Sequence, residues 1–125
     1  MVIFDTNIII DHLRQSPEKS KLLSLFKKYN EEKFSMSIVS LQELYEGQST
    51  KKHDVHEKLL NTLANLEILP YTFEVAKLAG EIARDIGRPI DLADAAIAGT
   101  AIINDCKLVT LNMKDFKGIK GLELL

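Results

Sequence analysis

The chain has 125 residues, of which 46% are hydrophobic and 27% are charged, and its net charge is −2. This composition predicts one globular domain over residues 1–125, and it excludes a protein that binds polyanions through general positive charge. The single cysteine, Cys106, excludes an internal disulfide and a cysteine zinc site. Because no apolar run is long enough to span a membrane and a strand pattern begins at Met1, we expect a cytoplasmic protein without a signal peptide or a membrane contact.

The first predicted element is a short buried strand that ends on a carboxylate. Residues 2–4 form an unbroken apolar run, which is typical of a strand covered on both faces. A helical pattern follows at once, so the strand gives way to a helix across Asp5, Thr6 and Asn7. Two interpretations of Asp5 are open. It caps the helix, or it lies at the carboxyl end of a central parallel strand, where open α/β sheets bind ligands and metals.

Helices and strands alternate along the rest of the chain. A second helix is predicted from Ser16, as its N-cap, to about residue 29, and the alternating residues 34–38 predict a half-buried strand. The remaining predicted elements are helices at 40–47, 53–65, 72–86 and 91–103, and strands at 66–69, 107–111 and 122–125. Strands separated by helices indicate a parallel sheet sandwiched between α-helices, a three-layer α/β/α fold.

Two acidic residues lie near predicted helix starts, and each has a structural and a functional interpretation. Ser40 and Glu43 have the spacing of a capping box, in which the glutamate accepts a hydrogen bond from the N-cap amide. Asp94 belongs to a helix that is apolar nearly all round, and a buried ionised carboxylate requires a cation or several donors. Asp91 offers an alternative, because it can cap this helix and leave Asp94 stabilised by the helix dipole. Asp94 is nevertheless a functional-site candidate.

The predicted topology brings these acids together. Asp115 follows the fourth strand and, taken alone, indicates only a turn. In a parallel sheet, however, Asp5, Glu43 and Asp115 all follow the carboxyl ends of strands, and the helix of Asp94 begins at the same edge. Carboxylates so close together repel one another unless divalent cations lie between them. Ligation by carboxylate oxygens alone suits Mg²⁺ or Mn²⁺ rather than zinc.

Four short motifs follow one another along the chain in a characteristic order. They are Asp5-Thr6-Asn7 closing the first strand, Glu43 opening a helix, Gly87-Arg-Pro-Ile leading to Asp94-Ala-Ala-Ile-Ala-Gly-Thr-Ala, and Leu108-Val-Thr-Leu-Asn112-Met-Lys-Asp115-Phe. In this order they resemble the PIN domain, and most of all the VapC toxins of prokaryotic toxin–antitoxin pairs. The resemblance covers essentially the whole chain.

The resemblance implies a metal-dependent ribonuclease, usually a homodimer, that is inhibited by a cognate antitoxin. Asp5, Glu43 and Asp94 match the acidic triad of the family, and Asp5 and Asp94 are the expected ligands of Mg²⁺ or Mn²⁺. The implied reaction is hydrolysis of an RNA phosphodiester at one or two of these ions. No histidine is placed to act as the base, so either Glu43 or the metal hydroxide itself serves.

The resemblance also implies roles for polar residues beside the acids. Asn112 and Asp115 both fit the fourth acidic place, and we favour Asp115. Thr6 and Asn7 match polar residues that orient the first acid or a water molecule.

Three other functions are compatible with acids at a sheet edge. A response-regulator receiver, which is a phospho-switch, needs a phospho-accepting aspartate at the end of its third strand, and here that strand ends Ile68-Leu69-Pro70. A phosphatase of the haloacid dehalogenase type needs D-x-D after its first strand, and Asn7 stands at the second position. A non-catalytic PIN-like module that only binds RNA or a partner would be indicated by missing acids. All the expected acids are present, so the nuclease is favoured.

Overall fold

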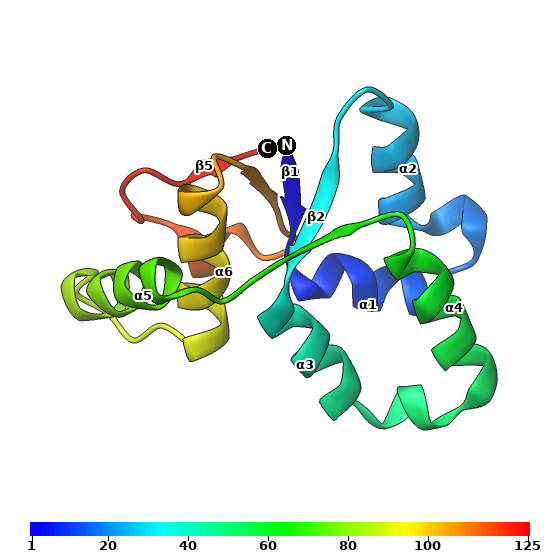
Figure 1. The fold of residues 1–125 in the computed structure, drawn as a ribbon. Coiled ribbons are helices and arrows are strands. Elements are labelled where there is room, and N and C mark those ends of the chain that lie inside the picture. Colours follow the sequence, from blue (N-terminus) through cyan, green and yellow to red (C-terminus); the bar gives the residue numbers. More distant parts are fainter.

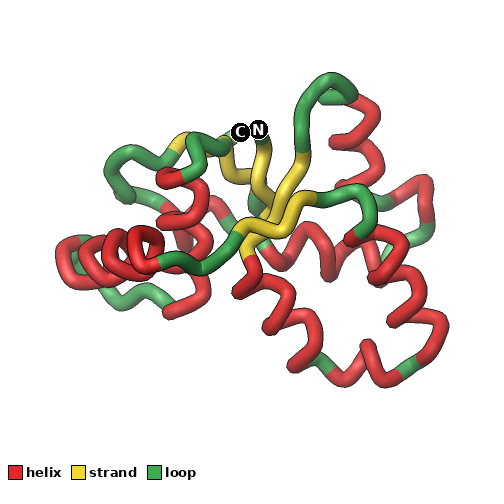
Figure 2. Tube along the Cα trace, in the orientation of Figure 1, coloured by secondary structure: helices red, strands yellow, loops and turns green.

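Five short parallel strands form the centre of the molecule in the computed structural model, which describes residues 1–125 (Figures 1 and 2). The strands are β1 (Val2–Phe4), β2 (Phe34–Ser37), β3 (Glu67–Leu69), β4 (Lys107–Val109) and β5 (Glu123–Leu124). Their order across the sheet is β3-β2-β1-β4-β5, and every neighbouring pair is parallel. The predicted parallel sheet is therefore confirmed, with β1 at its centre.

Helices cover both faces of this sheet (Figure 1). The α-helices are α1 (Thr6–Arg14), α2 (Lys21–Lys28), α3 (Ile38–Glu46), α4 (His53–Leu63), α5 (Phe73–Asp85) and α6 (Leu92–Ile103), and the short 3₁₀-helices are η1 (Pro17–Lys19), η2 (Gln48–Lys51) and η3 (Met113–Phe116). Side chains of α1 to α4 form one buried cluster, and α6 with η3 forms a second. This arrangement confirms the three-layer α/β/α fold. None of the helices combines the length and the apolar character needed to cross a membrane.

The central strand contributes to both layers of the core. Val2 and Phe4 belong to the cluster with α1 to α4, whereas Ile3 belongs to the cluster with α6. This division follows the two-residue period of a strand, in which successive side chains point to opposite faces. The unbroken apolar run at residues 2–4 therefore corresponds to a strand buried on both faces, as predicted.

The second strand is buried more deeply than its alternating pattern predicts. Ser35 and Ser37 are fully buried, because β2 lies between β1 and β3 and is covered on both faces. The hydroxyl of Ser35 donates to the carbonyl oxygen of Val2 at 2.9 Å, and Ser37 Oγ accepts a hydrogen bond from the amide of Val39 at 3.1 Å. The prediction of a half-buried strand was wrong because both serines satisfy their polar groups inside the protein.

Two helices begin at serines other than those predicted. The N-cap of α2 is Ser20, whose Oγ accepts from the amide of Leu23, and the residues after Ser16 form only the short helix η1. The N-cap of α3 is Ser37, so Ser40 lies inside the helix and the predicted capping box with Glu43 does not form. Both corrections exchange one serine for another within a few residues, because serines have the same intrinsic capping preference.

The close contact between α5 and α6 depends on Gly99. A β-carbon at this position would lie 3.1 Å from the carbonyl oxygen of Val75 and 3.4 Å from the amide nitrogen of Ala79. A side chain here would therefore separate the two helices, and α6 carries Asp94 in its first turn.

We predict that Gly99→Ala lowers the free energy of unfolding by at least about 1 kcal/mol relative to Gly80→Ala. Both changes gain the helix propensity of alanine, up to about 1 kcal/mol. Only the change at Gly99 overpacks the helix contact, which costs typically about 1–3 kcal/mol, because a β-carbon at Gly80 meets nothing within 4 Å. Denaturant unfolding of both variants measures the difference. Equal stabilisation by the two substitutions would contradict the close packing at Gly99.

Candidate active site

Asp5 is a buried carboxylate at the end of the central strand. Its backbone occupies the N-cap position of α1, but its side chain makes no capping hydrogen bond. Instead, Asp5 Oδ2 accepts a hydrogen bond from Thr110 Oγ1 at 2.7 Å. Burial raises the pKa of Asp5, and the hydrogen bond from Thr110 opposes this shift only in part. The side chain therefore serves the sheet edge rather than the helix.

Glu43 is held by a residue from the first helix rather than by its own. Thr6 Oγ1 lies 2.6 Å from Glu43 Oε1 and 2.8 Å from Ser40 Oγ. A hydroxyl group carries one proton, and an ionised carboxylate is the stronger acceptor. Thr6 therefore orients the carboxylate of Glu43, across 37 residues of sequence.

Asp94 lies in the first turn of α6, and the other acids lie around it. Asp91 occupies the N-cap position of this helix but makes no side-chain capping bond. The pKa of Asp94 is raised to about 6, first by burial and then by the negative charges of Asp5, Asp115, Asp91 and Glu43. Three of the acids singled out in the sequence, Asp5, Glu43 and Asp115, therefore act electrostatically on the fourth, Asp94.

Both candidates for the fourth acidic position lie together after β4. Asn112 Nδ2 donates to Asp115 Oδ2 at 2.6 Å, so the amide holds the carboxylate. Arg88, from the loop before α6, donates to the carbonyl oxygens of Asp115 at 3.1 Å and Lys117 at 2.7 Å. The segment that carries Asp115 is thus fixed from two sides.

Thr110 is a site residue that the sequence patterns did not single out. Besides donating to Asp5, its hydroxyl oxygen accepts from the amide of Asn112 at 3.0 Å and from Asn7 Nδ2 at 3.3 Å. Asn7 Oδ1 in turn accepts from the amide of Leu111 at 3.2 Å. Since Phe4 pairs with Val109 in the sheet, Asp5 and Thr110 come directly after paired residues. This shared position of Asp5 and Thr110 at the ends of neighbouring strands is the sequence signal that could have identified Thr110.

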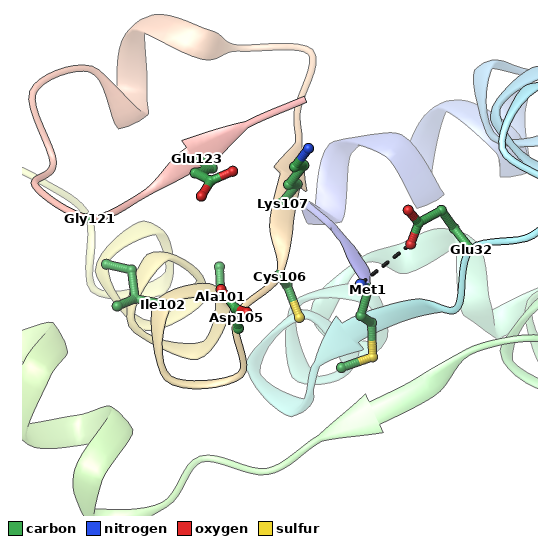
Figure 3. A pocket seen from close by; sticks show the side chains of 9 residues that line it. All are labelled: Met1, Glu32, Ala101, Ile102, Asp105, Cys106, Lys107, Gly121 and Glu123. Carbon is green, nitrogen blue, oxygen red and sulfur yellow. Dashed lines mark ion pairs between the residues drawn. The ribbon is translucent and has the colours of Figure 1, made fainter.

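A hollow at the opposite end of the sheet does not have the character of an active site (Figure 3). The terminal ammonium of Met1 pairs there with Glu32 at 3.4 Å. The thiol of Cys106 is buried, and burial raises its pKa, which disfavours the reactive thiolate. The acidic edge therefore remains the candidate active site.

Comparisons with known proteins agree with this geometry. The model of the PIN domain family matches residues 2–122. Ribonuclease VapC2 of Rickettsia felis is 33% identical over 98% of this chain and 94% of its own length. Ribonuclease VapC10 of Mycobacterium tuberculosis is 31% identical over 93% of this chain and 86% of its own length.

Solved structures extend the likeness to the fold. A crystal structure of VapBC2 from Rickettsia felis, bound to a DNA fragment from their promoter, superposes with a TM-score of 0.83 and 30% identity, covering 100% of this chain and 98% of that chain. FitAcB from Neisseria gonorrhoeae superposes with a TM-score of 0.81 and 26% identity, covering 100% and 97% of the two chains. The chain therefore belongs to the PIN domain family and, within it, to the VapC ribonucleases.

Proposed function

We propose that Asp5, Glu43, Asp94 and Asp115 form the divalent-metal centre at which this ribonuclease hydrolyses RNA. The observation that carries the proposal is the Asp94 carboxyl group, whose pKa is raised to about 6 by burial and by the charges of the other acids. Such a cluster is unfavourable when all its members are ionised, and a bound cation relieves the repulsion.

The donor set fits Mg²⁺ or Mn²⁺. It consists of carboxylate oxygens without histidine or cysteine, which are the ligands that hard cations prefer. No three acidic, histidine or cysteine side chains are already arranged closely enough to hold an ion by themselves. Three of the carboxylates accept hydrogen bonds from neighbours, namely Asp5 from Thr110, Glu43 from Thr6 and Asp115 from Asn112. Small side-chain movements would therefore accompany binding, with Asp5 and Asp94 as the principal ligands.

Other residues of the chain accept a proton, complete the acidic cluster and contact the RNA. Glu43 Oε1 is occupied by the hydroxyl of Thr6, so Oε2 is the oxygen that takes a proton from the attacking water. Asp115, held by Asn112, completes the cluster on the side of η3. When bound, Mg²⁺ or Mn²⁺ would lower the pKa of that water and offset the charge that builds up on the phosphate. The exposed Lys114 and Lys117 flank Asp115 and would contact neighbouring phosphates of the RNA.

The relatives indicate an antitoxin partner, and exposed apolar side chains on the surface indicate a second copy of the chain. The neighbouring solved structures include toxin–antitoxin complexes, and we propose that this chain is the toxin of such a pair. A cognate antitoxin would inhibit it by presenting a cationic side chain such as arginine to the carboxylates.

Phe73 and Leu92 are 83% and 82% exposed at the starts of the packed helices α5 and α6. Association of two copies of the chain would remove these apolar side chains from water, which supports a homodimer.

We predict that Asp94→Asn abolishes cleavage of RNA in Mg²⁺ or Mn²⁺ while the protein remains folded. The expected loss exceeds about 100-fold, since removing even an outer partner of a metal ligand costs about 10–100-fold. Glu74→Gln is the matched control, because Glu74 is an exposed acid in the first turn of α5 whose charge does not act on Asp94. Cleavage is measured on purified protein with EDTA as the blank. A folded Asp94→Asn protein that cuts at the wild-type rate would remove Asp94 from the centre.

We predict that the metal-free protein becomes more stable on mild acidification. The pKa of Asp94 is about 6 in the folded protein, whereas its ordinary value is 3.8. The folded state therefore holds the extra proton between these values, and stability rises as pH falls from about 7 to about 4. A shift of this size corresponds to about 3 kcal/mol, which solvent screening reduces to about 1–2 kcal/mol. In Asp94→Asn this contribution to the pH dependence should be absent, and its melting temperature at neutral pH should equal or exceed that of wild type.

Thermal melts with EDTA and with Mg²⁺ at matched ionic strength test the same centre through binding. Mg²⁺ should stabilise the wild type by about 1–3 kcal/mol when its concentration is ten- to a hundredfold above Kd. The response should be much smaller in Asp94→Asn. If both proteins respond equally to Mg²⁺, the ion does not bind at Asp94.

We predict that expression of this chain alone inhibits growth, and that co-expression of its cognate antitoxin relieves the inhibition. The physical reason is that a cationic side chain of the antitoxin neutralises the carboxylates and blocks access of RNA. The control is the Asp94→Asn protein, which should be harmless alone. A wild-type chain that is harmless by itself, with its acids intact, would refute the toxin role without refuting the nuclease activity measured in vitro.

A further inference from the structure

A groove extends from Glu43 away from the acidic edge. It lies between α1, α3, η2 and α4, which form a ring in Figure 1, and Glu43 forms part of its wall. The groove has a volume of about 270 Å³, slightly below the range of roughly 300–1,000 Å³ typical of drug-sized ligands. It is therefore suited to a group the size of one nucleobase, and it shares Glu43 with the proposed centre.

The floor of this groove, which we call the Glu43 groove, is apolar. Its apolar side chains come from three helices and are Ile10, Leu13, Leu44 and Val55. Leu44 also belongs to the buried core, so the floor has fixed support. An apolar floor accepts the flat face of an unpaired base without sequence preference, because every base has such a face.

Two positive charges line the same groove. Arg14 ends α1, and Lys52 follows η2; both side chains are exposed. Neither forms an ion pair with any carboxylate of the chain, although Glu43 lines the same groove. Glu43 is instead held by Thr6 at 2.6 Å. Both cations are therefore available to phosphate groups.

Two of the helices that line the groove, α3 and α4, are joined to each other before any ligand arrives. Tyr45 Oη and His56 Nε2 are 2.8 Å apart and join α3 to α4, and the two rings meet edge to face at 5.4 Å between centroids. A preformed groove loses less conformational entropy on binding than a flexible one.

We propose that the Glu43 groove holds the nucleotide next to the scissile phosphate of a single-stranded RNA. The base lies on the apolar floor, and Arg14 and Lys52 contact the phosphates that follow. The RNA is single-stranded here, because the bases of a duplex are stacked and paired and cannot enter a groove. This assignment rests on the proposed ribonuclease function and extends it to the binding of substrate. A protein segment is the other possible occupant, and the experiment separates the two.

The test measures binding of a fluorescently labelled, unstructured RNA oligonucleotide to protein that carries Asp94→Asn, so that the RNA is not cut. Arg14→Gln and Lys52→Gln should each weaken binding and reduce the salt dependence. Each lost phosphate contact lowers the slope of log K against log salt by about 0.7 for single strands, which makes the loss of affinity from about 50 to 200 mM salt about 2.5-fold smaller. Lys33→Gln is the control, because Lys33 is an exposed lysine directly before β2, at the amino edge of the sheet.

Cleavage by the active protein gives the second readout. Arg14→Gln should raise KM for RNA with little change in kcat, whereas loss of an acid of the centre lowers kcat. If the wild type does not cleave RNA, the ribonuclease proposal fails, and the binding assay still decides whether RNA occupies the groove. Unchanged affinity and salt slope in both variants would overturn the assignment. Unchanged RNA binding together with lost binding of a purified antitoxin would assign the groove to the protein partner instead, and would also overturn it.

Discussion

The buried carboxylate of Asp5 is the constraint on which the rest of the site depends. Asp5 is 6% exposed at the end of the central strand, where an ionised group is costly unless donors or cations surround it. Thr110 supplies one hydrogen bond, but the pKa of Asp5 remains raised, and the charge of Asp5 raises that of Asp94 in turn. The fold thus holds together a cluster of charges that is unfavourable by itself, and a bound cation would remove this local cost.

Two threonines transmit this constraint to the elements around the sheet. Thr110 joins the end of β1 to the segment after β4 through Asp5, Asn7 and Asn112, and Thr6 joins α1 to α3 through Glu43. Each hydroxyl lies at or next to the carboxyl end of a strand. Asp5 and Glu43 are therefore held by residues from other segments, and Asp94 is placed by the first turn of α6. A site that must hold its groups within fractions of an ångström needs such supporting contacts.

Much of this arrangement could be predicted from the sequence, because it depends on patterns that local chemistry determines. The buried run at residues 2–4 and the apolar helix with Asp94 were identified from hydrophobicity alone, and the alternation of helices and strands indicated the parallel sheet. The two errors in the helix starts share one cause. Serines are equivalent as caps in isolation, and tertiary contacts choose among them: Ser20 Oγ also contacts His12 Nδ1 at 2.7 Å, and Ser37 ends a strand. Thr110 was missed because a threonine at a strand end is ordinary by propensity.

The distribution of charged residues explains how a chain with a net negative charge can bind RNA, which is also negatively charged. A chain with net charge −2 and its acids gathered at one edge repels RNA from the proposed place of cleavage. A bound cation would offset this repulsion at the cluster, but salt screening limits the attraction it could exert on the rest of the strand to about 10 Å. Attraction for the rest of the strand must therefore come from positive groups outside the cluster. Exposed Lys114 and Lys117 lie on the side of η3, and Arg14 and Lys52 lie on the side of α1. Cations on both sides allow a strand to cross the acids without a globally basic protein.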